Sequence, residues 1–281
     1  MSANDWLAGS VKANGVSLHW TRTGGDLPQV VLAHGFTDDG LCWTPIAEAL
    51  EGDYDIVMLD ARGHGQSEAP ERGYGPLVMG EDLAQAIVVL GLERPAVIAH
   101  SMGAMATLVA AGTHPDMVRA IVVEDPPSRW LRPLPGGLGR PSEVERLRQE
   151  IEVRRQLDRT ILVATARAEN PRWSDAELVP WADAKLRLRP ATAAALDPAE
   201  HASTDWRVIL HGITCPTLVI GADSEVGSLL SIDGEALIAE LVPQARIERI
   251  AGAGHSVRRD APDQYLRLIW DFLASWPPTS S

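Results

Sequence analysis

Short, continuously apolar segments alternate with helical ones along most of this 281-residue chain. A segment that is apolar throughout is typical of a strand buried on both faces, whereas a helix shows apolar residues at every third or fourth position. Strands separated by helices form a parallel sheet that is covered on both sides. The expected strands are 29–35, 54–60, 95–101, 118–125, 216–223 and 245–252, and the helices between or after them are 41–50, 77–92, 102–114, 232–242 and 262–276.

Two segments depart from this alternation. Residues 10–20 alternate around Asn14-Gly15, which predicts a hairpin of two antiparallel strands near the start. Residues 126–206 are charged, interrupted by prolines and helical, with clear helices at 142–157 and 174–188 and no visible strand. We interpret this insertion as a helical cap over the sheet edge that holds ligands in open α/β proteins. Residues 1–125 and 207–281 would form the core.

Composition limits the partners and the compartment. With 25 basic and 38 acidic residues the net charge is −13, which disfavours nucleic acid and anionic membrane surfaces. The chain shows no secretory signal and no apolar run long enough to span a membrane. The two cysteines, Cys42 and Cys215, are interpreted as reduced buried thiols. These features predict a cytoplasmic protein, and they leave its oligomeric state open.

Ser101 lies between an expected strand and an expected helix. This is the setting in which the pentapeptide G-x-S-x-G places a nucleophilic serine on a sharp turn. Here the pentapeptide is Ala99-His100-Ser101-Met102-Gly103, so an alanine replaces the first glycine. A serine that only caps the helix is the alternative interpretation.

Two further segments supply partners for such a serine. His34-Gly35-Phe36 ends an earlier strand, where the backbone N–H of Phe36 can join that of Met102 in an oxyanion hole. His255 lies in a glycine-rich loop after the last strand, so it can approach the serine as a general base.

The acid that would orient His255 has several candidates. Asp223 ends the penultimate strand and is the preferred one. Glu225 lies two residues later, and Glu124 and Asp125 end the strand before the insertion. All four stay open, because the choice depends on geometry.

Together these residues resemble the α/β-hydrolase family. The resemblance runs from about Gly15 to Trp276 and is carried by "HGFTDDG", "LDARGHGQS", "AHSMGA", "GAD" and "GAGH" in that order. It implies an eight-stranded, mostly parallel sheet with a helical cap between the sixth and seventh strands. It also implies that Asp60 to Ser67 is mainly structural and braces the loop beside the site.

A serine at the turn indicates acyl chemistry, because the family's dehalogenases and epoxide hydrolases carry aspartate there. The expected reaction is hydrolysis of a medium-sized, fairly apolar ester or lactone through an acyl-enzyme, with no cofactor and no metal. The alternatives are a C–C bond hydrolase or cofactor-free perhydrolase with the same three residues, and a non-catalytic sensor of a small ligand.

The substrate pocket is predicted mainly from tryptophans. The chain has nine, several of them in the insertion, where they would either hold it on the sheet or form an apolar roof over Ser101. The candidate pocket residues are His34, Gly35, Trp43, His100, Trp130, Trp173 and Trp181.

Overall fold

A computed structural model describes residues 6–128 and 139–276. Its centre is one eight-stranded sheet in the order β1-β2-β4-β3-β5-β6-β7-β8. β1 pairs antiparallel with β2, β2 pairs antiparallel with β4, and every other neighbouring pair is parallel. The expected fold class is thus confirmed. The strands are β1 (Leu7–Ala13), β2 (Val16–Arg22), β3 (Gln29–Ala33), β4 (Asp55–Leu59), β5 (Ala96–His100), β6 (Ala120–Glu124), β7 (Thr217–Gly221) and β8 (Ala245–Arg249).

The predicted hairpin joins β1 to β2. Asn14 and Gly15 both have positive φ, 47° and 80°, as a tight two-residue turn between right-twisted strands requires.

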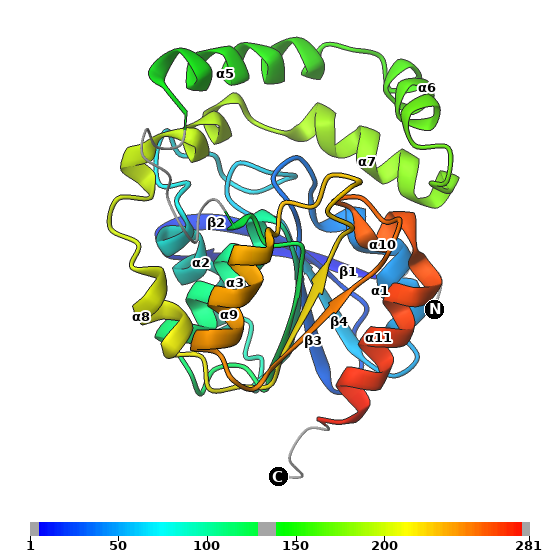
Figure 1. The fold of residues 1–281 in the computed structure, drawn as a ribbon. Coiled ribbons are helices and arrows are strands. Elements are labelled where there is room, and N and C mark those ends of the chain that lie inside the picture. The colour runs from blue at the N-terminus through cyan, green and yellow to red at the C-terminus, as the bar shows by residue number, and fades with distance from the viewer. Residues whose placement is uncertain (1–5, 129–138, 277–281) are drawn as a thin grey trace.

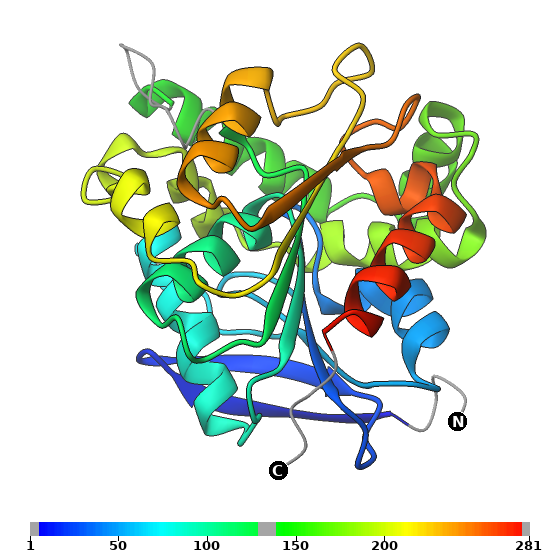
Figure 2. The same ribbon diagram turned by 60° about the horizontal axis from the view of Figure 1, so that its bottom comes forward.

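Helices cover both faces of the sheet, as the two views of the ribbon show (Figures 1 and 2). Alternate residues of each central strand enter opposite cores: Val97 and Ala99 of β5 pack on one side, Ala96 and Ile98 on the other. This explains why the strands are apolar throughout. One face is covered by α2 (Pro76–Val89), α3 (Met102–Thr113), α8 (Trp206–His211) and α9 (Ile232–Leu241), and the other by α1 (Thr44–Leu50), α10 (Val257–Asp260) and α11 (Pro262–Ala274).

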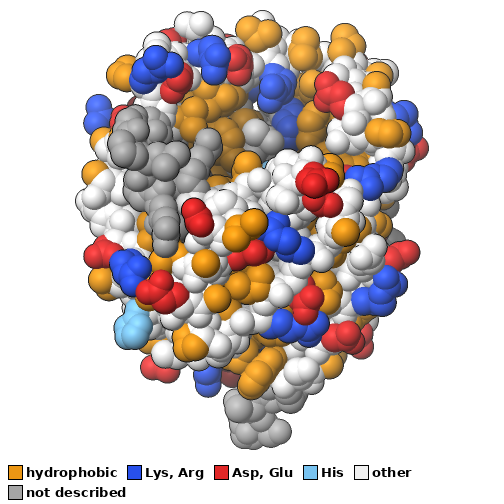
Figure 3. Space-filling model, in the orientation of Figure 1, with side chains coloured by type: hydrophobic (Ala, Val, Ile, Leu, Met, Phe, Trp, Pro, Cys, Tyr) orange, Lys and Arg blue, Asp and Glu red, His pale blue; other side chains and the backbone are white. Residues whose placement is uncertain are grey.

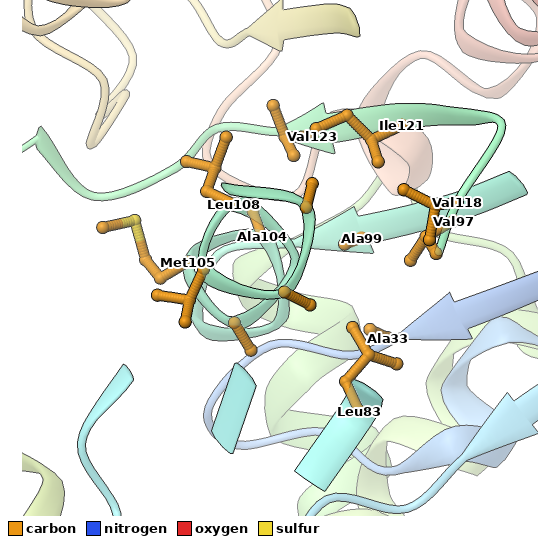
Figure 4. Packing of buried hydrophobic residues seen from close by; sticks show 14 of the residues in the cluster. Ala33, Leu83, Val97, Ala99, Ala104, Met105, Leu108, Val118, Ile121 and Val123 are labelled. Atoms are coloured by element: carbon orange, nitrogen blue, oxygen red, sulfur yellow. The ribbon is translucent and has the colours of Figure 1, made fainter. Parts of the chain in front are cut away.

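Helix α3 lies close against the strands because its residues are small. Ala104 and Leu108 of α3 pack on Ala99 of β5 and on Val123 of β6 in the core that Figure 4 shows. The close packing leaves little freedom for α3 to shift. Ser101, which directly precedes it, therefore has a fixed position relative to the sheet.

The described residues between β6 and β7 contain helices and no strand. In Figure 1 the first three of these helices form a layer above the sheet and the other helices. This insertion follows the sixth strand, where the family resemblance placed it. Its elements are α5 (Pro141–Arg155), α6 (Arg159–Glu169), α7 (Asp175–Arg187) and the 3-10 helices η3 (Pro190–Leu196) and η4 (Pro198–Glu200), and a further 3-10 helix, η2 (Gly40–Trp43), precedes α1.

Both cysteines are free and buried. Within residues 6–128 and 139–276, every helix is too short or too polar to cross a membrane.

Candidate active site

Ser101 sits on a strained turn between β5 and α3. Its φ of 52° and ψ of −112° are unusual for a residue with a side chain and cost on the order of 1–3 kcal/mol. Its N–H donates to the carbonyl oxygen of Glu124 at 2.9 Å, which ties the turn to β6. A glycine is required two residues later, at Gly103, because a Cβ there would lie 2.5 Å from the carbonyl oxygen of Ala33. At Ala99 the extra methyl is fully buried in the core without disturbing the strand pairing.

A continuous hydrogen-bonded series links Ser101 to His255 and to Asp125. Nε2 of His255 lies 2.9 Å from Oγ of Ser101, and Nδ1 lies 2.6 Å from Oδ2 of Asp125. The His255 side chain is 31% exposed, whereas that of Asp125 is completely buried. A hydroxyl, an imidazole with one nitrogen on each neighbour, and a buried carboxylate form the arrangement that activates a serine for nucleophilic attack.

The carboxylate of Asp125 is held by several donors besides His255. Oδ1 accepts from the hydroxyl of Ser228 at 2.6 Å, and Oδ2 accepts from the N–H of Leu229 at 2.8 Å. Burial raises the pKa of Asp125, but the hydrogen bonds from His255, Ser228 and Leu229 outweigh it, and the pKa lies below its usual value. Asp125 is therefore ionised at neutral pH.

Asp223, the preferred acid, makes no hydrogen bond to His255 in the described part of the chain, so the expected contact is corrected. Its carboxylate accepts the N–H groups of Glu225 and Gly252 at 2.9 and 2.8 Å, so it joins the loop after β7 to the loop that carries His255. The carboxylate of Glu124 accepts from the N–H and the guanidinium of Arg258 and makes no hydrogen bond to His255 in the described part of the chain. Asp125, one of the alternatives left open, is the residue that contacts His255.

The loop after β3 brings Phe36 into the same pocket as Ser101 and Met102. Within the described part of the chain, the N–H groups of Phe36 and Met102 donate to no acceptor. The carbonyl oxygen of Phe36 lies 2.6 Å from Nε2 of His64. The segment Asp60 to Ser67 therefore braces this loop, as the resemblance implied.

A pocket of about 250 Å³ opens beside Ser101. Figure 3 shows hydrophobic side chains in a hollow below the layer of the insertion helices. The pocket residues, from the core and from the insertion, are Gly35, Phe36, Thr37, Asp38, His100, Ser101, Met102, Pro127, Trp181, Ala195, Leu196, Leu229, His255, Ser256 and Arg259.

Among the predicted pocket residues, Gly35, His100 and Trp181 lie in this lining. His34 does not: its Nε2 accepts the N–H of Ala61, so it shapes the loop. Trp43 is also outside the lining, because it is fully buried beneath the guanidinium of Arg258. Both expectations are corrected, since each ring packs into the core behind the loop.

The other two predicted tryptophans are Trp173 and Trp130, and Trp173 is not among the residues that line the pocket beside Ser101 in the described part of the chain. Trp173 lines an adjoining groove, where its indole N–H donates to Asp260 at 2.9 Å. Trp130 lies outside the described residues.

His100 has a defined protonation state. Its Nε2 lies 2.9 Å from the carbonyl oxygen of His255 and donates to it, while Nδ1 is buried without a partner among the described residues. Burial, and then the neighbouring His255, holds the pKa of His100 well below its usual value. His100 is therefore neutral and fixes the loop that carries the catalytic candidate.

A buried network of charges borders the pocket, and it was not predicted from the sequence. Asp38 accepts from Lys185 at 3.2 Å and from Arg258 and Arg259, each at 2.9 Å. Arg258 also pairs with Glu124, and Arg259 with Glu177 of α7. The adjacent arginines directly after "GAGHSV" could have been noticed, but their partners are distant in sequence.

No group of three or more His, Cys, Asp or Glu side chains in residues 6–128 and 139–276 is arranged to hold a metal ion.

Comparison with known proteins agrees with this fold. Residues 28–258 match the family described as the alpha/beta hydrolase fold, and the chain belongs to that family. It is 28% identical over 267 residues to N-formylmaleamate deformylase of Pseudomonas putida, covering 94% of this chain and 96% of the relative. It is 27% identical to 2-(acetamidomethylene)succinate hydrolase of Mesorhizobium japonicum, covering 90% of each. A crystal structure of E-2-(acetamidomethylene)succinate hydrolase superposes with a TM-score of 0.77 at 23% identity, covering 95% of this chain and 98% of that one.

Proposed function

We propose that this protein is a serine hydrolase that cleaves a small, fairly apolar carboxylic ester or lactone through an acyl-enzyme intermediate. The observation that carries the proposal is the hydrogen-bonded series Ser101–His255–Asp125 at the edge of the pocket. Membership of a hydrolase family supports an enzymatic role.

The reaction follows from the positions of these groups. Nε2 of His255 takes the proton of Ser101 as Oγ attacks the carbonyl carbon, and Asp125 stabilises the imidazolium through Nδ1–H. The N–H groups of Phe36 and Met102 donate to the oxyanion. The C–O bond of the substrate then breaks, His255 returns the proton to the leaving oxygen, and an ester on Ser101 forms. Water, deprotonated by His255, hydrolyses this ester and restores Ser101.

The charges of the pocket lining favour an uncharged substrate. Its described lining contains one cation, Arg259, and one anion, Asp38, and these two pair with each other. Its volume of about 250 Å³ lies below the usual range of pockets for drug-sized ligands. Short acyl groups are therefore favoured over long ones, with the insertion of residues 126–206 acting as the cap that closes over them.

Cleavage of an N-acyl bond is a second candidate. Two relatives that cover at least 90% of this chain are named for a formyl amide and for an acetamido compound. The same serine, imidazole and oxyanion donors would serve an amide, with His255 protonating a leaving nitrogen. C–C bond hydrolysis and perhydrolysis with these residues remain the further alternatives, and product analysis distinguishes them.

The test is a panel of p-nitrophenyl esters from acetate to decanoate, measured on wild type and on Ser101→Ala. We expect kcat/KM to be highest for the short esters and to fall by a factor of about 10³ or more in Ser101→Ala. To test the charge preference, p-nitrophenyl butyrate is compared with p-nitrophenyl hydrogen succinate, which adds a carboxylate, and the neutral ester should react faster. An N-formyl or N-acetyl amide is assayed in parallel.

The outcomes separate the candidates. Equal rates for wild type and Ser101→Ala would contradict any serine mechanism and favour the non-catalytic sensor. Amide turnover that exceeds ester turnover, and is lost in Ser101→Ala, would favour N-acyl hydrolysis. Both proteins should show the same melting temperature, so that the lost activity reflects chemistry.

A further inference from the structure

One face of helix α7 lies against both the pocket and the loop that carries Phe36. Glu177, Trp181 and Lys185 follow each other at intervals of four residues, so they share that face. Glu177 pairs with Arg259, Trp181 lines the pocket, and the ammonium group of Lys185 lies 4.4 Å from the centre of the Trp181 ring. The insertion is therefore attached to the site at several points along α7.

Lys185 makes an unusual contact for a lysine. Its side chain is 2% exposed. Its Nζ donates to the carbonyl oxygen of Thr37 at 2.6 Å and to Oδ1 of Asp38 at 3.2 Å. A buried ammonium group is costly unless it is paired and hydrogen-bonded, and these two acceptors meet that requirement. Thr37 directly follows Phe36, whose N–H is the proposed oxyanion donor.

The loop is held at three consecutive carbonyl groups. That of Gly35 accepts from the N–H of Asp38 at 3.1 Å, and that of Phe36 lies 2.6 Å from His64. The third, on Thr37, is held by Lys185 and so by the insertion. Each peptide group is planar, so the carbonyl of Thr37 fixes the direction of the N–H of Asp38. That N–H donates to the carbonyl of Gly35, which shares a peptide plane with the N–H of Phe36 and so fixes its direction.

We propose that Lys185 is a positioning residue, which fixes the Thr37 carbonyl from helix α7 and so directs the N–H of Phe36 at the oxyanion. This inference rests on the proposed serine mechanism. It makes the docked insertion a requirement for fast chemistry, because the core supplies the donor and the insertion supplies the group that holds it. A misplacement of about 1 Å can reduce a rate about 100-fold.

The test compares Lys185→Met with Arg187→Met. Arg187 is the matched control, since it lies on the same helix and pairs with Asp39 of the same loop but holds no carbonyl group of it. In Lys185→Met we expect kcat for a short p-nitrophenyl ester to fall about 10- to 100-fold, with KM changed less than about threefold. Arg187→Met should keep kcat within about threefold of wild type. Equal losses in both variants would contradict the proposal and indicate only a weakened attachment of the insertion.

A second measurement separates positioning from charge. An alkylboronic acid forms a tetrahedral, anionic adduct with an active serine, so its affinity should fall in Lys185→Met by about the same factor as kcat/KM. The double variant Asp38→Asn/Lys185→Met removes one charge of each sign, and Arg258 and Arg259 stay balanced by Glu124 and Glu177. It should remain as impaired as Lys185→Met, and recovery of wild-type kcat in it would overturn the proposal.

Thermal melting checks that each variant is folded. If Lys185→Met alone does not fold, the kcat of the double variant is compared with that of wild type instead. The two hypotheses fail differently. Loss of activity in Ser101→Ala with full activity in Lys185→Met would refute the role of Lys185 alone. Full activity in Ser101→Ala would refute the serine mechanism itself.

Discussion

Asp125 lies beside His255 because two segments distant in sequence meet around its carboxylate. The chain leaves β6 at Asp125 with a φ of 42°, which turns the side chain toward the loop after β7. There the hydroxyl of Ser228 and the N–H of Leu229 hold the two oxygens. A carboxylate fixed in this way orients the imidazole and keeps its own charge.

The residue-scale prediction compares two aspartates. Asp125→Asn should lower kcat about 10³- to 10⁴-fold, because the amide no longer stabilises the imidazolium or enforces its tautomer. Asp223→Asn should cost less than about tenfold, since Asp223 holds only backbone N–H groups of the loops. Ester hydrolysis by both purified variants checks this. The reverse order of effects would restore Asp223 as the acid.

A second residue-scale prediction concerns His100 and acid stability. Because the pKa of His100 in the folded protein is well below its usual value of 6.5, the unfolded chain binds a proton that the folded protein does not. The stability it contributes is present above pH 6.5 and is lost as the pH falls below that value. The melting temperature should fall by several degrees between pH 7 and pH 5, and less in His100→Gln, which keeps a donor toward the carbonyl of His255. Circular dichroism melts would show this, and identical slopes would disprove it.

At the scale of elements, the position of Ser101 depends on how closely α3 approaches β3. A Cβ at residue 103 would lie 2.5 Å from the carbonyl oxygen of Ala33 and 2.7 Å from that of His34. Both are backbone atoms, so neither can rotate away. The helix start and the loop that leads to Phe36 are thus locked together at this glycine.

Gly103→Ala is therefore expected to push α3 away from β3. Unfolding by urea should show a loss of about 1–3 kcal/mol, and ester hydrolysis should fall as well, because Ser101 and the Phe36 loop move apart. Gly52→Ala is the control, since a Cβ there meets nothing within 4 Å. If Gly103→Ala and Gly52→Ala were equally stable and active, this account of the turn would be incorrect.

At the scale of the whole molecule, the site is assembled from the core and the insertion. The core contributes the serine, the imidazole, the carboxylate and the loop after β3, and α7 contributes Trp181 and Lys185. Three buried cations, Lys185, Arg258 and Arg259, connect the two parts through Asp38. Each must keep its partners, because an unpaired charge in this interior would be strongly destabilising. The ion pairs that attach the insertion to the core are thus the same ones that keep the charges beside the pocket paired.

Much of the fold follows from local sequence patterns. Residues 30–33 and 96–99 are apolar throughout because both faces of the sheet are covered, and the sequence shows this pattern without any tertiary information. Helix α6 was not predicted between the two helices expected in the insertion; it is mostly exposed, and of its residues only Leu162 and Ala166 are buried. The helix α10 was not separated from the loop after His255, because its 4 residues are too few to show a helical period.

The sequence by itself determined the alternation of strands and helices, the turn at Ser101 and the candidates His255, Phe36 and Met102, because each depends on neighbours a few residues away. Only the tertiary structure decided that Asp125 and not Asp223 meets the imidazole, and that Lys185 reaches the carbonyl of Thr37. Those contacts join residues 130 and 148 positions apart in the chain. Their geometry depends on strand order and on the direction in which a buried side chain leaves its element, and neither is encoded in local spacing.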